Sequence, residues 1–253
     1  MDLDRIGKIS KRGARRLSHL LARFTWATVA DPRRFGSSIQ RAAMGMLIAG
    51  LWLGSVPDTE AAMQGKREQL ISILGVTLQE KRPIGTVAHL VVSFEERTDQ
   101  SGLAVQFRVT PGRFSPMAQT AVRQAILRAA HAAGLDTRSW NVILSVLHPG
   151  VTVYGESLSA MVSLSVIALA KGDFIPPDRV ITGAVSPDGK IVPVGGVSLK
   201  VAAADQAHLR RVLVPDELDI ADSDWRTPFL MQVSPVGSVS QAYLALTDHP
   251  LSP

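Results

Sequence analysis

The sequence predicts an α+β fold for most of this chain, on three observations. Short runs rich in Val, Leu and Phe, some with hairpin signals between them, interleave with segments of helical periodicity. One segment, beginning at Leu158, is apolar nearly all round a helix and must be buried. A hydrophobic content of 46% in 253 residues is enough to form a substantial core around it.

The N-terminal part of the chain differs sharply from the rest in charge. Residues 1–41, a basic N-terminal segment, hold ten Lys or Arg against three Asp, a net charge of +7 that leaves −2 for the remainder. A net charge of −2 does not indicate a basic face on the folded body. Aromatic residues, on which nucleic-acid bases could stack, are only 5% of the chain. We therefore expect no nucleic-acid binding by the folded body, and any such binding would reside in residues 1–41.

Residues 42–56 form an uncharged run that follows the basic segment. We interpret it as one short hydrophobic helix, either a membrane anchor or a signal-like segment, although its fifteen residues are few for a bilayer core that needs about 20. Because positive charge favours the cytoplasmic side, the prediction is a membrane-associated chain with a single N-terminal span and its body outside the cytoplasm. Export after cleavage, or a cytoplasmic protein with 42–56 as a buried helix, are the alternatives.

Residues 57–83 are polar and mixed, and we predict a linker with one short helix around Glu68 to Leu74. The predicted body spans 84–247 and is followed by a tail, 248–253. Its first two strands, 86–94 and 103–110, are separated by a polar, Gly-containing segment that indicates a hairpin.

The rest of the body is predicted from its start and stop signals. Ser115 before Pro116 is an N-cap followed by a first-turn proline, which predicts a helix that ends near Gly134. Asp188-Gly189 is a strong two-residue hairpin signal, expected to join strands at 180–182 and 190–193. The remaining expected elements are a strand at 140–147, the buried helix up to Gly172, a helix at 197–208, strands at 211–215 and 229–233, and a helix at 239–246.

Two residues in this order could support acyl-transfer chemistry. Ser157 follows Gly155-Glu156 at the start of the buried helix, where a sharp turn leaves backbone N–H groups able to hold an oxyanion. Lys200 lies in an Ala-rich and Val-rich helix, and a lysine can activate a serine when burial lowers its pKa. The alternatives are an ordinary serine N-cap and a lysine on the exposed side of an amphipathic helix. Ser159 is the reserve candidate for the nucleophile.

Several short motifs, taken in order, resemble the proteolytic domain of Lon proteases. In that family a serine in a Gly-Pro-Ser-Ala-Gly or Gly-Asp-Ser-Ala-Ser setting precedes Thr-Gly-Glu, then Gly-x-Val-x-Pro-x-Gly-Gly and a lysine. The matching residues here are Gly155 to Ala160, Thr182-Gly183, Gly189 to Gly196, and Lys200. The resemblance covers roughly 84–247 and implies a mixed sheet packed against helices, a Ser157–Lys200 dyad, Thr182 as a residue that helps position the lysine, and assembly into a homo-oligomer.

The chain departs from the family pattern at three positions close to the serine. Tyr154 stands where the family has an acidic residue, Ala184 replaces the acid of Thr-Gly-Glu, and Leu158 replaces the small residue after the serine. Glu156 matches the Gly-Asp-Ser variant and could compensate.

The expected function is ATP-independent, Lon-like serine endopeptidase activity on a polypeptide substrate. No Gly-Lys-Ser or Gly-Lys-Thr occurs, so the sequence printed here has no phosphate-binding P-loop of an ATPase module. No cofactor is expected, and no cluster of His with carboxylates indicates a metal. The alternative is a catalytically inactive, Lon-like scaffold or partner-binding module.

Overall fold

The computed structural model describes residues 65–217, 228 and 230–251. The predicted basic segment 1–41 and hydrophobic helix 42–56 lie outside the described residues. Within the described ranges, no helix is long and apolar enough to cross a membrane. Membrane attachment therefore stays a prediction from the sequence alone.

The described residues form four helices and four small sheets, which confirms the α+β class. The helices are α1 (Pro116–Ala132), α2 (Ser159–Lys171), α3 (Val197–Gln206) and α4 (Val239–Thr247). The strands are β1 (Arg67–Gln79), β2 (Arg82–Glu96), β3 (Ala104–Phe107), β4 (Arg113–Phe114), β5 (Trp140–Val146), β6 (Thr152–Val153), β7 (Arg179–Ile181), β8 (Ala184–Val185), β9 (Ile191–Val192), β10 (Arg211–Pro215) and β11 (Gln232–Val236).

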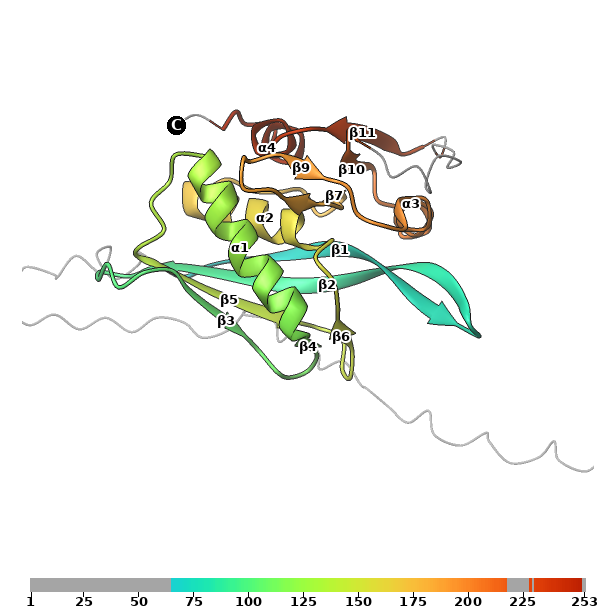
Figure 1. Ribbon diagram of the computed structural model, residues 1–253, viewed down its shortest axis with the longest axis horizontal. Coiled ribbons are helices and arrows are strands. Elements are labelled where there is room, and N and C mark those ends of the chain that lie inside the picture. The colour runs from blue at the N-terminus through green and yellow to red at the C-terminus, as the bar shows by residue number, and fades with distance from the viewer. Residues whose placement is uncertain (1–64, 218–227, 229, 252–253) are drawn as a thin grey trace, which may run out of the picture. The chain divides into compact units, whose positions relative to one another are not determined.

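The largest sheet is mixed and has the strand order β1-β2-β5-β3. Its first three strands are antiparallel neighbours, whereas β3 pairs with β5 in parallel. A second sheet, β11-β10-β7, is entirely parallel, and the pairs β4-β6 and β8-β9 are separate. Figure 1 shows α2 between the large sheet and the group formed by β7, β10, β11 and α4, with α1 crossing in front of it.

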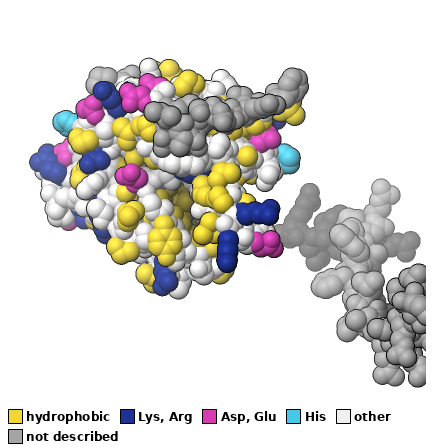
Figure 2. All heavy atoms as spheres, turned by 45° about the vertical axis from the view of Figure 1, so that its right-hand side comes forward, with side chains coloured by type: hydrophobic (Ala, Val, Ile, Leu, Met, Phe, Trp, Pro, Cys, Tyr) yellow, Lys and Arg dark blue, Asp and Glu magenta, His cyan; other side chains and the backbone are white. Residues whose placement is uncertain are grey.

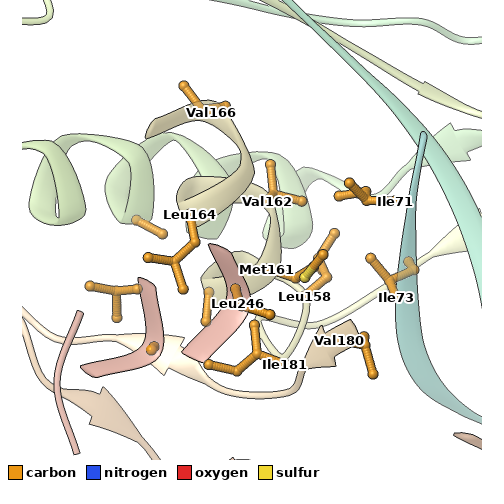
Figure 3. Close-up of a cluster of buried hydrophobic side chains, with 14 of the residues drawn as sticks. Ile71, Ile73, Leu158, Met161, Val162, Leu164, Val166, Val180, Ile181 and Leu246 are labelled. Carbon is orange, nitrogen blue, oxygen red and sulfur yellow. The ribbon is translucent and has the colours of Figure 1, made fainter. Parts of the chain in front are cut away.

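Helix α2 lies at the centre of this arrangement. Its first eleven residues, Ser159 to Leu169, are all buried. Figure 3 shows its apolar side chains facing Ile71 and Ile73 of β1 on one side and Val180, Ile181 and Leu246 on another. The prediction of a helix buried on all sides is confirmed. Helix α2 ends at its C-cap, Gly172, which has φ +78°, a left-handed conformation that glycine adopts at little cost.

Other local signals also gave the right elements. Ser115 caps α1, since its hydroxyl accepts a hydrogen bond from the Ala118 N–H at 3.2 Å. Strand β5 alternates strictly between buried and partly exposed residues, as a strand with one covered face should. Strand β10 has the predicted bounds, and α3 and α4 agree with prediction within two residues.

The prediction of a linker with a short helix before residue 84 is wrong from Arg67 onward. This stretch is β1, which pairs with β2 along its whole length, from Arg67 opposite Phe94 to Gln79 opposite Arg82. The two-residue turn between them, Glu80-Lys81, has φ +51° and φ +65°. Such a turn normally contains Asn or Gly, so no hairpin signal is present in the sequence at this point.

The predicted hairpin between 86–94 and 103–110 is also wrong. The second strand is shorter, Ala104–Phe107, and it pairs in parallel with β5. The Gly102 N–H donates to the Arg138 carbonyl at 2.9 Å, so the chain reaches the sheet beside the start of β5 and not beside β2.

Two further strand predictions need correction. Strand β9 does form a hairpin at Asp188-Gly189, but its partner is β8, whereas β7 pairs in parallel with β10. The strand expected at 229–233 is β11, Gln232–Val236. In both cases the local apolar pattern fits more than one register, and the partner strand decides which one forms.

We predict that Leu164→Ala destabilises the protein by about 2–5 kcal/mol, because Leu164 is 0% exposed in α2 and its removal leaves a cavity. Urea denaturation would measure the loss. Leu244→Ala is the matched control, since this α4 residue is 48% exposed, and it should change the unfolding free energy by less than about 1 kcal/mol. Equal losses for the two variants would contradict the central role of α2.

Candidate active site

Ser157 lies in the turn that leads directly into α2. Gly155, two residues earlier, has φ +80°, so the chain turns there in a conformation that a larger side chain rarely adopts. Two backbone hydrogen bonds fasten this turn to Gly183: the Gly183 N–H donates to the Ser157 carbonyl at 3.1 Å, and the Ala160 N–H donates to the Gly183 carbonyl at 3.2 Å. The Ser157 side chain is thus carried by a turn that is held at both its ends.

Lys200 is buried, with an exposed fraction of only 3%. It is the fourth residue of α3, and its Nζ donates to the Gly195 carbonyl oxygen at 2.8 Å. A lysine on the exposed side of an amphipathic helix, the alternative from the sequence, is therefore wrong. Removing an ammonium group from water is costly unless it is paired or neutral, which makes this position unusual for a lysine.

Ser157 and Lys200 line the same cavity, which has a volume of about 510 Å³. One wall is the hairpin of β1 and β2, from Ile73 to Thr77 and from Thr86 to Ala88, and another is the loop from His148 to Tyr154. Most of the lining side chains are apolar, and no Asp or Glu is among the described residues that line the cavity. In Figure 2, hydrophobic side chains are gathered in the middle of one face of the molecule.

Thr182 is completely buried and follows β7. Its N–H donates to the Leu213 carbonyl at 3.0 Å, which fixes its backbone to β10. Its hydroxyl oxygen, Oγ1, has no hydrogen-bond partner. Burying a hydroxyl without a hydrogen-bond partner costs free energy, so packing alone does not explain a threonine at position 182.

The other predicted site residues are placed in different surroundings. Ser159 is 1% exposed as the first residue of α2 and does not line the cavity, which favours Ser157 over this reserve candidate. Glu156 is exposed and lies in a separate shallow hollow beside the first turns of α1. The structure therefore does not bring its carboxylate into the cavity of Ser157 and Lys200.

The three departures from the family pattern are accommodated in different ways. Tyr154 is 72% exposed and lines the cavity. Leu158 is 2% exposed and joins the apolar cluster around α2 (Figure 3). Ala184 is 6% exposed in β8. Two of the three thus extend the core, and one adds an aromatic side chain to the cavity.

His148 also lines the cavity, and none of the sequence motifs described above includes it. Its Nε2 accepts a hydrogen bond from the His89 N–H at 3.1 Å, and the two rings stack with centroids 5.7 Å apart. The bond requires an unprotonated Nε2, so any proton of a neutral ring is on Nδ1. Nothing local in the sequence links these two histidines, because the pairing of β2 with β5 brings them together.

The described residues contain no group of three or more His, Cys, Asp or Glu that could hold a metal ion. Among the described side chains, the polar groups that line the cavity include the Ser157 hydroxyl, the Lys200 amine, the His148 imidazole and the Tyr154 phenol.

Comparison with known proteins identifies this region. Residues 118–241 match the family model of the Lon protease (S16) C-terminal proteolytic domain. The chain is 28% identical over 134 residues to the archaeal Lon protease of Archaeoglobus fulgidus, with 53% of this chain and 22% of that protein covered. It is 27% identical over 145 residues to the archaeal Lon protease of Thermococcus kodakarensis, with 56% and 23% covered.

A bacterial relative, the Lon protease of Phenylobacterium zucineum, is 33% identical over 95 residues, which are 36% of this chain and 12% of that protein. The matched region thus spans less than a quarter of the length of each of these relatives. The resemblance inferred from the sequence motifs is confirmed, and the matched region contains Ser157, Thr182 and Lys200. The part of this chain that contains Ser157, Thr182 and Lys200 is therefore similar to the Lon protease (S16) C-terminal proteolytic domain.

Proposed function

We propose that this chain is a Lon-like serine endopeptidase that hydrolyses peptide bonds with a Ser157–Lys200 dyad. The observation that carries the proposal is that these two side chains, 43 positions apart in the sequence, line one cavity, and that the lysine is 97% buried there. A buried titratable side chain in a cavity that also contains a nucleophile is a feature of many active sites. The family of residues 118–241 supports a peptidase of the serine type.

In the proposed reaction, the Ser157 hydroxyl attacks the carbonyl carbon of a peptide bond while neutral Lys200 takes its proton. Backbone N–H groups of the turn that contains Ser157 stabilise the oxyanion, since the N–H groups of Ser159 and Ala160 at the start of α2 already donate to the carbonyls of Glu156 and Gly183. Lys200 then gives its proton to the leaving amine, and water hydrolyses the acyl-enzyme. The mostly apolar lining of the cavity and the burial of Lys200 support this role, because burial disfavours the charged form of a lysine.

Thr182 completes the proposed site as a positioning residue. It lies next to Gly183, which is hydrogen-bonded to the Ser157 turn, and its buried hydroxyl has no partner in this conformation. We propose that this hydroxyl accepts a hydrogen bond from Lys200 during the reaction. The same proposal includes hydrolysis without ATP by the residues printed above, among which no P-loop motif occurs.

We predict that Ser157→Ala and Lys200→Ala each lower the rate of hydrolysis of fluorescein-labelled, unfolded casein by at least about 1,000-fold, because each removes one partner of a unit that acts together. Ser101→Ala and Lys190→Ala are matched controls at exposed positions and should retain the wild-type rate. Wild-type activity in either dyad variant would refute the dyad. Loss of activity in Ser159→Ala, with Ser157→Ala active, would identify Ser159 as the nucleophile.

Thr182→Val separates a positioning role from a purely structural one. Valine has nearly the same shape and lacks the buried hydroxyl, so we expect the free energy of unfolding to be unchanged or raised by up to about 1 kcal/mol. We expect kcat to fall about tenfold or more, because Lys200 loses a group that orients it. Denaturant unfolding and steady-state kinetics on the same preparation would measure both. A variant with unaltered kcat would remove Thr182 from the proposed mechanism.

A further inference from the structure

The helix that carries Lys200 rests directly on the β1–β2 hairpin at one cross-strand pair, Val76 opposite Gly85. A Cβ atom added to Gly85 would lie 1.9 Å from the Leu199 carbonyl oxygen and 2.6 Å from its carbonyl carbon. It would also lie 2.9 Å from Cβ of Ala203, one turn further along α3. No side chain fits at residue 85, so the backbones of β2 and α3 are in direct contact.

The other strand of the hairpin contacts the start of the same helix. Gly196 is the N-terminal cap of α3 and has φ +70°. A Cβ atom there would lie 2.8 Å from Cγ2 of Val76. Because Val76 and Gly85 are paired, a single rung of the hairpin touches α3 at its cap and at Leu199, the residue before Lys200. We call Val76 and Gly85 the α3 seat.

These contacts determine how far Lys200 reaches into the cavity. The Lys200 N–H donates to the Gly196 carbonyl at 3.1 Å, and its Nζ donates to the Gly195 carbonyl at 2.8 Å, so both ends of the lysine are tied to the cap that touches Val76. Residues of the seat's own strands, Gly75 to Thr77 and Thr86 to Ala88, line the cavity. A displacement of α3 from the hairpin would therefore move the lysine relative to that wall.

We propose that the α3 seat sets the depth of Lys200 in the cavity, which makes Gly85 a positioning residue for the reaction of Ser157. This inference rests on the proposed Ser157–Lys200 function. It assigns to β2, a strand outside the matched family region 118–241, a role in the geometry of the site. Any side chain at position 85 pushes against helix backbone, which cannot rotate away as a side chain can.

The test uses the full chain with Gly85→Ala, measured by steady-state hydrolysis of a fluorogenic peptide that the wild type cleaves. A misplacement of a catalytic group by about 1 Å costs about 100-fold in rate, so we expect kcat to fall by about that factor with KM changed less than about threefold. We also expect the acid limb of the pH–rate profile to move to higher pH, because a lysine that is less buried holds its proton to higher pH.

Gly237→Ala is the matched control. Its added Cβ is also tight, at 2.2 Å, but against a carboxylate oxygen of Asp216, a side chain that can rotate, and neither residue lines the cavity. This variant should keep kcat within about twofold of wild type. If Gly85→Ala does not fold, Gly196→Ala tests the same seat from its other side, and Val76→Ala in that background should restore part of the lost kcat.

The possible results distinguish a failure of the proposed role of the α3 seat from a failure of the proposed Ser157–Lys200 dyad. Wild-type kcat and an unshifted acid limb in folded Gly85→Ala, together with an inactive Lys200→Ala, would overturn the seat alone. A lowered melting temperature with unchanged kcat per folded molecule would also overturn it, as would the absence of rescue by Val76→Ala. Hydrolysis by Lys200→Ala, or none by the wild type, would overturn the proposed function and the seat with it.

Discussion

The burial of α2 on every side is the constraint on which the rest of this structure depends. A helix without a polar face must be covered all round, and here the large sheet, α1, β7 and α4 cover it. Two serines of this helix can also be buried, because the hydroxyls of Ser163 and Ser165 donate to the carbonyls of Ala160 and Met161 within the helix. The first place where this segment meets the cavity is Ser157, directly before the helix. Ser157 is therefore a partly exposed serine just before a helix that is buried on every side.

The two proposed catalytic residues are held by elements far apart in the sequence. Ser157 is fastened through Gly183 to the strand that pairs with β10, whereas Lys200 is fastened to the β1–β2 hairpin through Gly196 and Leu199. Helix α2 contacts both systems, because its apolar side chains face Ile71 and Ile73 of β1 and Val180 and Ile181 of β7 (Figure 3). Rigid packing around α2 is therefore what fixes the serine relative to the lysine, although α2 itself contributes neither residue.

The sequence predicted what is encoded locally and missed what depends on partners. The Ser115 cap, the Gly172 stop, the Asp188-Gly189 turn and the alternation in β5 each have a short-range cause, and each was found. The β1–β2 hairpin was missed because Glu80-Lys81 adopts positive φ without Asn or Gly. The pairing of β3 with β5 and the stacking of His148 on His89 arise only when distant segments meet.

For the site, motif order indicated Ser157, Thr182 and Lys200, but no local pattern could show that Glu156 faces α1 or that Gly85 touches α3.

The departures near Ser157 have a common physical consequence. With Tyr154, Leu158 and Ala184 in place of family residues, no carboxylate is among the described residues that line the cavity. Backbone contacts orient both site residues here: Gly183 hydrogen-bonds to the serine turn on both its donor and acceptor sides, and the Gly195 carbonyl accepts from Lys200 Nζ. This carbonyl contributes orientation without a formal negative charge. Orientation by backbone groups in an apolar cavity is therefore compatible with a lysine that must act as a base.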